Sequence, residues 1–210
     1  MTQPYISKFL EVAFDNGFTF TDESRNKYKF YTYEIGKLKL VDGKIIACDP
    51  FLYNRDLPFN TLFPVGDYPV QLAIAKIDTD ERVAFSRIKF SDKKSAKWSI
   101  ALCDGQNILD LKQDEIFGYG VDSGTGAFMD TSGGKELMNF LTEKENNFQV
   151  LIDEMEKNYK HTWDWLLWES NNCNVAMFKS GLGDGVYATY IGYDSNGNIC
   201  RLVSDFGVID

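Results

Sequence analysis

The chain has 210 residues, an ordinary share of apolar side chains, many aromatic ones and a formal net charge of −9. Its length suits a single domain, which we expect to span residues 1–210 and to bury a sizeable core. The acidic charge repels nucleic-acid phosphate, so DNA and RNA are not expected partners, whereas a basic protein is one.

The N-terminal part of the chain predicts a short helix followed by a hairpin. Residues 5–14 form a helical pattern whose apolar face carries Ile6, Phe9, Leu10 and Ala13. Residues 18–30 are polar and mixed, as in a loop. Residues 31–41 alternate between apolar and polar, and Asp42-Gly43 is typical of a type I′ turn. We therefore expect Leu40 to pair with Ile45 across this turn.

Three further strands are predicted in the middle of the chain. Residues 67–77 alternate, and their apolar face carries Tyr68, Val70, Leu72 and Ile74. Residues 83–90 return after a polar turn, and residues 97–102 follow as a third strand. This pattern predicts a β-meander. Residues 116–121 are again strand-like and end at a Gly-rich turn.

Residues 135–160 are the long helical region of the sequence. An apolar stripe at helical spacing is formed by Leu137, Leu141, Phe148, Ile152, Met155 and Tyr159. Thr142-x-x-Glu145 has the spacing of a capping box, so we expect two helices that meet near Thr142. Residues 173–178 then form a strand.

The terminal hairpin is the clearest structural signal in the sequence. Asn196-Gly197 favours a two-residue type I′ turn. Counting outward from it pairs Tyr193 with Cys200, Ile191 with Leu202, Thr189 with Ser204 and Tyr187 with Phe206. We expect Tyr187, Ile191, Leu202 and Phe206 to be buried on one face. The fold class is therefore α+β, mainly antiparallel meander and hairpins, with a helical region around 135–160 and a short N-terminal helix.

Metal, cofactor and membrane signals are weak in this sequence. The four cysteines lack Cys-x-x-Cys spacing and there is one histidine, so we expect reduced thiols, no metal site and no cofactor. No P-loop or dinucleotide fingerprint occurs. The N-terminus does not resemble a signal peptide and no stretch has the roughly 20 apolar residues of a membrane span. We therefore expect a cytoplasmic protein without a membrane partner.

Acidic residues in Gly-rich loops are the candidate functional residues. Asp122 ends one predicted strand and Asp184 precedes another, so their loops meet if the strand ends share a sheet edge. Ser123 and Thr125 would add hydroxyl groups, and Asp130 a third carboxylate. The functional hypothesis is one shared cleft lined by these five residues. The alternative is that each aspartate only caps its own turn, because turns favour Asp for backbone reasons.

Two short motifs have a functional and a structural interpretation. Residues 121–126, Val-Asp-Ser-Gly-Thr-Gly, resemble the core of aspartic proteases, whose two carboxylates share a proton. A single copy would need a symmetric dimer, and a tight turn explains the same residues. Residues 194–198, Asp-Ser-Asn-Gly-Asn, echo the ligand spacing of a calcium loop, but the glycine is misplaced and the hairpin turn explains them better.

Four segments together resemble the bacterial family of unknown function DUF4241. They are residues 43–50 (GKIIACDP), 64–70 (PVGDYPV), 121–126 with Asp130, and 180–187 (SGLGDGVY). The resemblance runs from about residue 37 to the end of the chain. It implies a soluble, single-domain bacterial protein, and it assigns neither an activity nor a catalytic residue.

Two classes of function follow, and the sequence leaves open whether the chain is an enzyme. The first is a non-enzymatic protein-binding domain, in its specific form an antitoxin-like immunity protein whose acidic face blocks a basic toxin. The second is a hydrolase that uses Asp122, Asp130 and Asp184, with a divalent cation as a further possibility. Convergence of these carboxylates favours the hydrolase, and scatter over separate turns favours binding.

Overall fold

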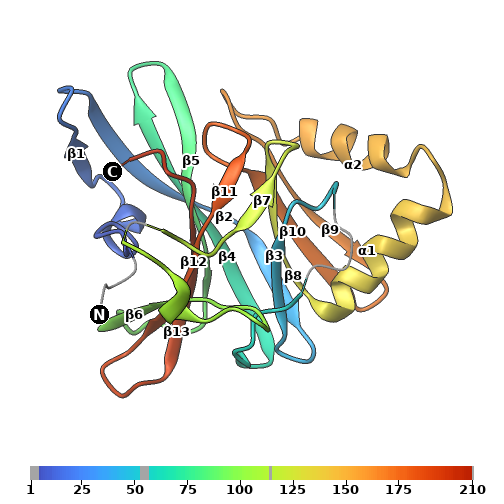
Figure 1. The fold of residues 1–210 in the computed structure, drawn as a ribbon. Coiled ribbons are helices and arrows are strands. Elements are labelled where there is room, and N and C mark those ends of the chain that lie inside the picture. The colour runs from blue at the N-terminus through green and yellow to red at the C-terminus, as the bar shows by residue number, and fades with distance from the viewer. Residues whose placement is uncertain (1–4, 53–56, 114, 210) are drawn as a thin grey trace.

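The computed structural model describes residues 5–52, 57–113 and 115–209. It has the predicted α+β fold class, with mainly antiparallel strands and two α-helices. A large curled sheet packs against a smaller sheet, and the two helices cover the far side of the smaller sheet (Figure 1). Within the described ranges, no helix is long and apolar enough to cross a membrane.

The large sheet has seven antiparallel strands in the order β1-β2-β4-β5-β13-β12-β6. These are β1 (Thr19–Thr21), β2 (Lys27–Leu40), β4 (Gly66–Ile77), β5 (Asp80–Lys89), β6 (Lys97–Ile100), β12 (Thr189–Tyr193) and β13 (Ile199–Asp205). The C-terminal strand β13 lies in the middle of the sheet, paired with β5 and β12. The terminal hairpin is therefore central to the sheet.

The smaller sheet has the order β3-β8-β10-β9, and a separate two-stranded ribbon pairs β7 with β11. The bounds are β3 (Ile45–Cys48), β7 (Tyr119–Val121), β8 (Thr125–Asp130), β9 (Trp165–Ser170), β10 (Cys173–Lys179) and β11 (Gly185–Tyr187). The helices are α1 (Thr131–Glu143), α2 (Asn147–Glu156) and the short 3-10 helices Val12–Phe14 and Ile108–Asp110. The strand β7 leads directly into β8, and β10 into β11, so the ribbon extends one end of the smaller sheet (Figure 1).

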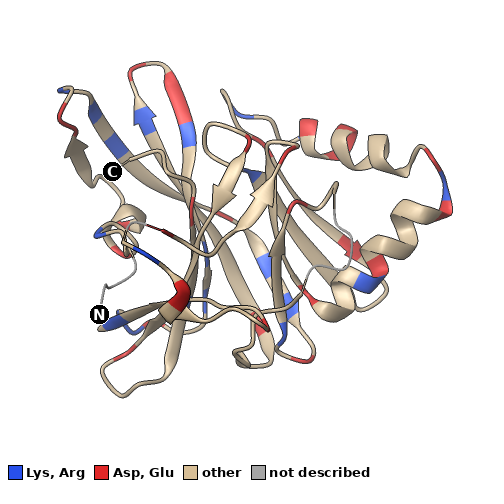
Figure 2. Cartoon of the chain, viewed as in Figure 1, with Lys and Arg blue, Asp and Glu red and all other residues tan. Residues whose placement is uncertain are grey.

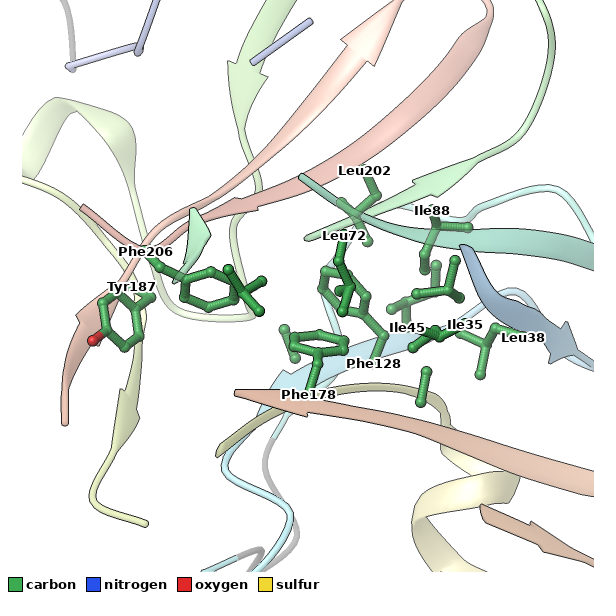
Figure 3. Close-up of a cluster of buried hydrophobic side chains, with 14 of the residues drawn as sticks. Ile35, Leu38, Ile45, Leu72, Ile88, Phe128, Phe178, Tyr187, Leu202 and Phe206 are labelled. Carbon is green, nitrogen blue, oxygen red and sulfur yellow. The ribbon is translucent and has the colours of Figure 1, made fainter. Parts of the chain in front are cut away.

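The main core lies between the two sheets. Strand alternation sends one face of each strand into it, so the two sheets contribute interdigitating side chains. Buried there are Ile35, Leu38, Leu72, Ile88 and Leu202 from the large sheet, with Ile45, Phe128 and Phe178 from the smaller one (Figure 3). The rings of Phe178 and Phe206 lie 6.0 Å apart, which links this core to the end of β13.

Two further apolar layers cover the outer faces of the sheets. The helices α1 and α2 pack Leu137, Leu151 and Met155 onto the outer face of the smaller sheet. The N-terminal segment packs Phe9, Leu10, Ala13 and Phe14 onto the outer face of the large sheet. An ion pair of 3.0 Å between Glu11 and the buried Arg201 fixes this segment. The chain thus stacks four layers, each bound to the next by apolar contacts.

The N-terminal prediction is corrected in its secondary structure. Residues 8–11 form turns and only Val12–Phe14 form a 3-10 helix, so the predicted helix over 5–14 does not occur. Phe9, Leu10 and Ala13 are buried as expected, whereas Ile6 is exposed. A helix this short is marginal by itself, and packing onto the sheet replaces it with turns.

The hairpin predicted at Asp42-Gly43 is wrong. The strand β2 pairs with β4, and β3 pairs with β8 in the other sheet. The turn therefore carries the chain from one sheet to the other. Its amides at residues 41–43 donate to the carboxylate of Asp130, a partner that is distant in sequence and that no local pattern reveals.

The meander is correct for two of its three strands. The strands β4 and β5 are adjacent, and Val70, Leu72 and Ile74 are buried on one face as predicted. The third strand, β6, pairs instead with β12 at the far edge of the sheet. The terminal hairpin inserts between β5 and β6, which is a long-range pairing that strand alternation alone does not specify.

The terminal hairpin confirms the predicted register in its middle. Ile191 pairs with Leu202 and Thr189 with Ser204, and the apolar face is buried. The predicted pairing of Tyr187 with Phe206 is wrong, because Tyr187 lies in β11 and pairs with Tyr119. Near the turn the register shifts by one, so Tyr193 pairs with Ile199 and not with Cys200. Asp194 Oδ1 accepts from the amides of Asn196 and Asn198, and Gly197 alone has positive φ, +80°. These contacts define a three-residue loop with a bulge in place of the two-residue type I′ turn.

The helical region contains two helices that meet close to the predicted position. The capping box is wrong, because the Thr142 hydroxyl donates to the carbonyl oxygens of Met138 and Asn139 inside α1. The predicted stripe is interrupted at the break between the helices, so Phe148 and Tyr159 are exposed and Leu151 is buried instead. The three residues between α1 and α2 change the helical phase.

Candidate functional site

Asp49 ties the loop after β3 to the loop after β7. Its Oδ2 accepts from the amides of Asp122 and Ser123 at 3.0 and 2.8 Å, and its Oδ1 accepts from the Ser123 hydroxyl at 2.8 Å. The same Oδ1 accepts from the amides of Phe51 and Leu52 at 2.9 and 3.3 Å. A carboxylate with five donors is a structural anchor, and it brings Leu52 beside Asp122.

Asp184 ties the loop before β11 to the same place. Its Oδ1 accepts from the Gly124 amide at 3.0 Å, although 60 residues separate the two. The Ser180 amide donates to the Gly124 carbonyl oxygen at 3.2 Å. Gly181 has φ of +56°, and a Cβ there would meet Phe206 at 2.8 Å, so glycine is required at this position. The two Gly-rich loops thus form one hydrogen-bonded unit.

The ribbon of β7 and β11 has a buried and an exposed face. Val121 and Tyr187 belong to the main core. The opposite face, by the period of two, carries Gly120 on β7 and Val186 on β11. Asp122 directly follows β7 and Asp184 directly precedes β11. All four of these residues are exposed, and Val186 lies directly opposite Gly120. We call Leu52, Gly120, Asp122, Leu182, Asp184 and Val186 the ribbon platform.

Asp122 and Asp184 are the two predicted site residues that the structure brings together. They follow and precede residues that pair with each other, Val121 and Gly185, so they lie at the same end of the ribbon. The Asp122 carboxylate makes no hydrogen bond or ion pair within the described residues, and its side chain points to solvent. The platform therefore carries two exposed negative charges.

Asp130 lies at the other end of β8 and is completely buried. It lies five residue steps along β8 from Thr125, a rise of about 17 Å. Its Oδ2 accepts from the amides of Val41, Asp42 and Gly43, and its Oδ1 accepts from the amide and hydroxyl of Ser132. It caps both a turn and the N-terminus of α1, so it acts as a structural residue.

The hydroxyl residues of the predicted site also separate. Ser123 lies on the platform loop, where its hydroxyl is held by Asp49 at 2.8 Å. Thr125 is buried, and within the described residues its Oγ1 has no hydrogen-bond partner. Within the described residues, neither hydroxyl contacts a histidine or lysine, and the Asp49 carboxylate that accepts from Ser123 also accepts from four backbone amides. The Ser123 hydroxyl therefore belongs to a loop anchor and lacks the dedicated base that activates a nucleophile.

A second cluster of titratable groups surrounds Glu81. The Glu81 carboxylate accepts from the Tyr31 hydroxyl at 2.6 Å and from Lys76 at 3.0 Å, and His161 lies 3.8 Å away. Burial raises the pKa of Glu81, but these hydrogen bonds outweigh it and hold the pKa below its usual value. Burial and the bond to Glu81 raise the pKa of Tyr31. Each group is paired, so the cluster joins the loop around His161 to β5.

The calcium-loop interpretation of residues 194–198 gives way to the hairpin loop. The Asp194 carboxylate is held by Lys93 at 2.8 Å and by the loop amides, which together lower its pKa. Among the residues that the structure describes, no three His, Cys, Asp or Glu side chains come together as metal ligands. The candidate site therefore consists of exposed carboxylates beside apolar side chains.

Sequence reasoning missed the apolar part of the platform. Leu182 and Val186 are 71% and 60% exposed, and Leu52 is 57% exposed. The available signal was the alternation Gly118-Tyr119-Gly120, in which the bare positions fall on one face of a strand. Aspartates are recognisable as candidate site residues from the sequence because they titrate and bind cations. The sequence does not show that an exposed valine lies opposite a glycine, because this depends on how the strands pair.

The fold and platform define the class: an α+β protein of antiparallel sheets with an acidic and partly apolar surface on hydrogen-bonded loops. Residues 38–204 match the family model described as "Protein of unknown function (DUF4241)", and the chain belongs to this family. No curated protein matches the chain, and no solved structure does. The family membership confirms the resemblance found in the sequence and assigns no activity.

Proposed function

We propose that the chain is a non-enzymatic protein-binding domain that binds a basic partner on the ribbon platform. The supporting observation is the combination of exposed Leu182 and Val186 with the exposed carboxylates of Asp122 and Asp184 on loops fixed by hydrogen bonds. Preorganised loops bind with a smaller entropy cost. An apolar centre with charged neighbours is the usual composition of a protein interface.

The charge around the platform favours a basic partner. Residues 113–134 and 180–200 contain no lysine or arginine, although they contain several acidic residues. Both ribbon strands are free of blue in Figure 2, which marks lysine and arginine. Complementary charge increases association rates and selects against acidic partners. An antitoxin-like immunity protein that covers a basic toxin surface is one specific form of this proposal.

The hydrolase alternative has less support from the geometry. Asp130 lies away from the platform with both oxygens occupied, and Ser123 has its hydroxyl held by Asp49. A carboxylate mechanism would rest on Asp122 and Asp184 alone. Both are exposed to water, and neither lies in the shielded site that carboxylate catalysis requires.

A phage-displayed random peptide library tests the proposal. Selection on the wild-type protein should enrich peptides rich in Lys and Arg. The double variant Asp122→Asn, Asp184→Asn should bind them about tenfold more weakly, since two exposed ion pairs contribute up to ~1 kcal/mol each. The side-chain carbonyl oxygen that Asp184→Asn retains can still accept from the Gly124 amide, so the loops stay connected.

The matched control removes the same charge elsewhere. Glu23→Gln with Asp67→Asn changes two exposed carboxylates beside β1 and on β4 and should leave peptide affinity unchanged. Selected peptides without a basic bias, a library that yields no binder, or equal loss in both double variants would contradict the proposal.

A further inference from the structure

Gly120 is a glycine without a role in its own fold. Its φ lies outside the left-handed region, and an added Cβ would meet no atom within 4 Å. Its neighbour Gly118 differs, because a Cβ there would meet the Tyr187 carbonyl oxygen at 2.6 Å. Glycine weakens a strand, since it adds backbone entropy and offers no side chain for packing. A strand glycine of this kind often marks a place where a ligand or another backbone approaches closely.

The surroundings of Gly120 form an open position with distinct chemistry. Val186 pairs with it across the ribbon and is 60% exposed, so a hydrophobic side chain borders bare backbone. Asp122 directly follows β7, two residues from Gly120, which at the rise of a strand is about 7 Å. Asp184 directly precedes β11, next to Gly185, which pairs with Val121. An aliphatic surface and two carboxylates are therefore neighbours at one end of the ribbon.

We propose that a lysine or arginine side chain of the basic partner lies across Gly120. The aliphatic stem contacts the bare backbone and Val186, and the charged head reaches the carboxylates of Asp122 and Asp184. Lysine and arginine combine an apolar stem with a cationic end, so they match this order of groups. This assignment rests on the proposed binding function and names the position where the central basic residue of the partner binds.

The charge pattern selects this occupant over others. A purely apolar segment would leave the two carboxylates facing it without counter-charge, and an acidic segment would be repelled. Residues 113–134 and 180–200 contain no lysine or arginine, so these segments supply no basic side chain to neutralise the carboxylates of Asp122 and Asp184. Within the described part of the chain, Asp122 has no ion pair, and its side chain is exposed.

Titration of the isotope-labelled full chain with hexalysine tests the inference by nuclear magnetic resonance. The amide signals of Gly120 and Val186 should shift on binding. Gly120→Val should weaken hexalysine binding at least about tenfold, because the new side chain fills the position of the stem. The variant should fold, since its Cβ meets open space and valine favours strands.

Two comparisons make the outcome specific. Thr19→Ile adds apolar bulk on the exposed strand β1 and should leave hexalysine affinity unchanged. If Asp122→Asn with Asp184→Asn weakens binding but Gly120→Val does not, the stem position is wrong and the binding proposal stands. If hexalysine does not bind, or no platform variant weakens it, both the inference and the proposed function are contradicted. If Gly120→Val lowers the melting temperature, the smaller variant Gly120→Ala is tested in its place. A hexalysine affinity of Gly120→Ala equal to that of the wild type would then also overturn the inference.

Discussion

Replacement of the buried Asp130 should destabilise the protein strongly. Asp130→Ala removes the N-cap of α1, which contributes about 1 kcal/mol. It also leaves the buried Gly43 amide without an acceptor, at a cost of about 1–3 kcal/mol. Water can replace the acceptor at the exposed residues Val41 and Asp42. The free energy of unfolding should therefore fall by about 3 kcal/mol, which lowers the melting temperature by roughly 6–12 °C in a chain of this size.

Thermal melts followed by circular dichroism measure this effect, with Asp122→Ala as the matched control. The Asp122 carboxylate is exposed, so its removal should change the melting temperature by less than about 2 °C. Asp130→Asn should fall between the two, because one amide oxygen can serve only one side of the double cap. A melting temperature within about 2 °C of wild type for Asp130→Ala would refute the structural role assigned to this carboxylate.

Three further predictions concern stability. Ile191→Asp places a carboxylate in the main core and should cost about 3 kcal/mol or more, and an unchanged melt would contradict the burial of this face. Gly120→Ala should raise the free energy of unfolding by about 0.5–1 kcal/mol in urea titrations, because an added Cβ meets open space, and a lowered value would contradict this. Burial raises the pKa of Asp164, so the ionised carboxylate reduces stability as pH rises through this raised pKa. Asp164→Asn should therefore raise the melting temperature at pH 7, and the gain should shrink toward pH 4; a constant gain would show that the charge is not its cause.

Local sequence patterns predicted the positions of the strands better than they predicted which strands pair with each other. Alternation identified β4, β5 and the terminal hairpin, since each sends alternate apolar side chains into the main core. Pairing between β3 and β8, or β6 and β12, depends on contacts between distant segments that no local pattern contains. The turn at Asp42-Gly43 shows the reason: its geometry is set by Asp130, 87 residues away from Gly43.

The candidate site was predictable in part for the same physical reason. Asp122 and Asp184 lie at the same end of the ribbon because β7 pairs with β11. Asp130 was grouped with them by composition, yet it lies at the opposite end of a strand. The sequence has an aspartate both at the end of the ribbon and at the far end of β8. Only the burial seen in the structure distinguishes the carboxylate that accepts from backbone amides from the carboxylates that face water.

The aspartates of the Gly-rich loops thus divide by what their oxygens contact. Asp49 and Asp130 each accept five hydrogen bonds and hold loops together, so their replacement acts through stability. The Asp122 side chain is exposed and accepts no such hydrogen bonds within the described residues. The Asp184 carboxylate accepts one hydrogen bond, from the Gly124 amide. Because the anchoring carboxylates fix the loops independently, charge on the platform can change without loss of the fold. Stability and binding should therefore respond to different substitutions, and that separation is what makes the binding proposal testable in a folded protein.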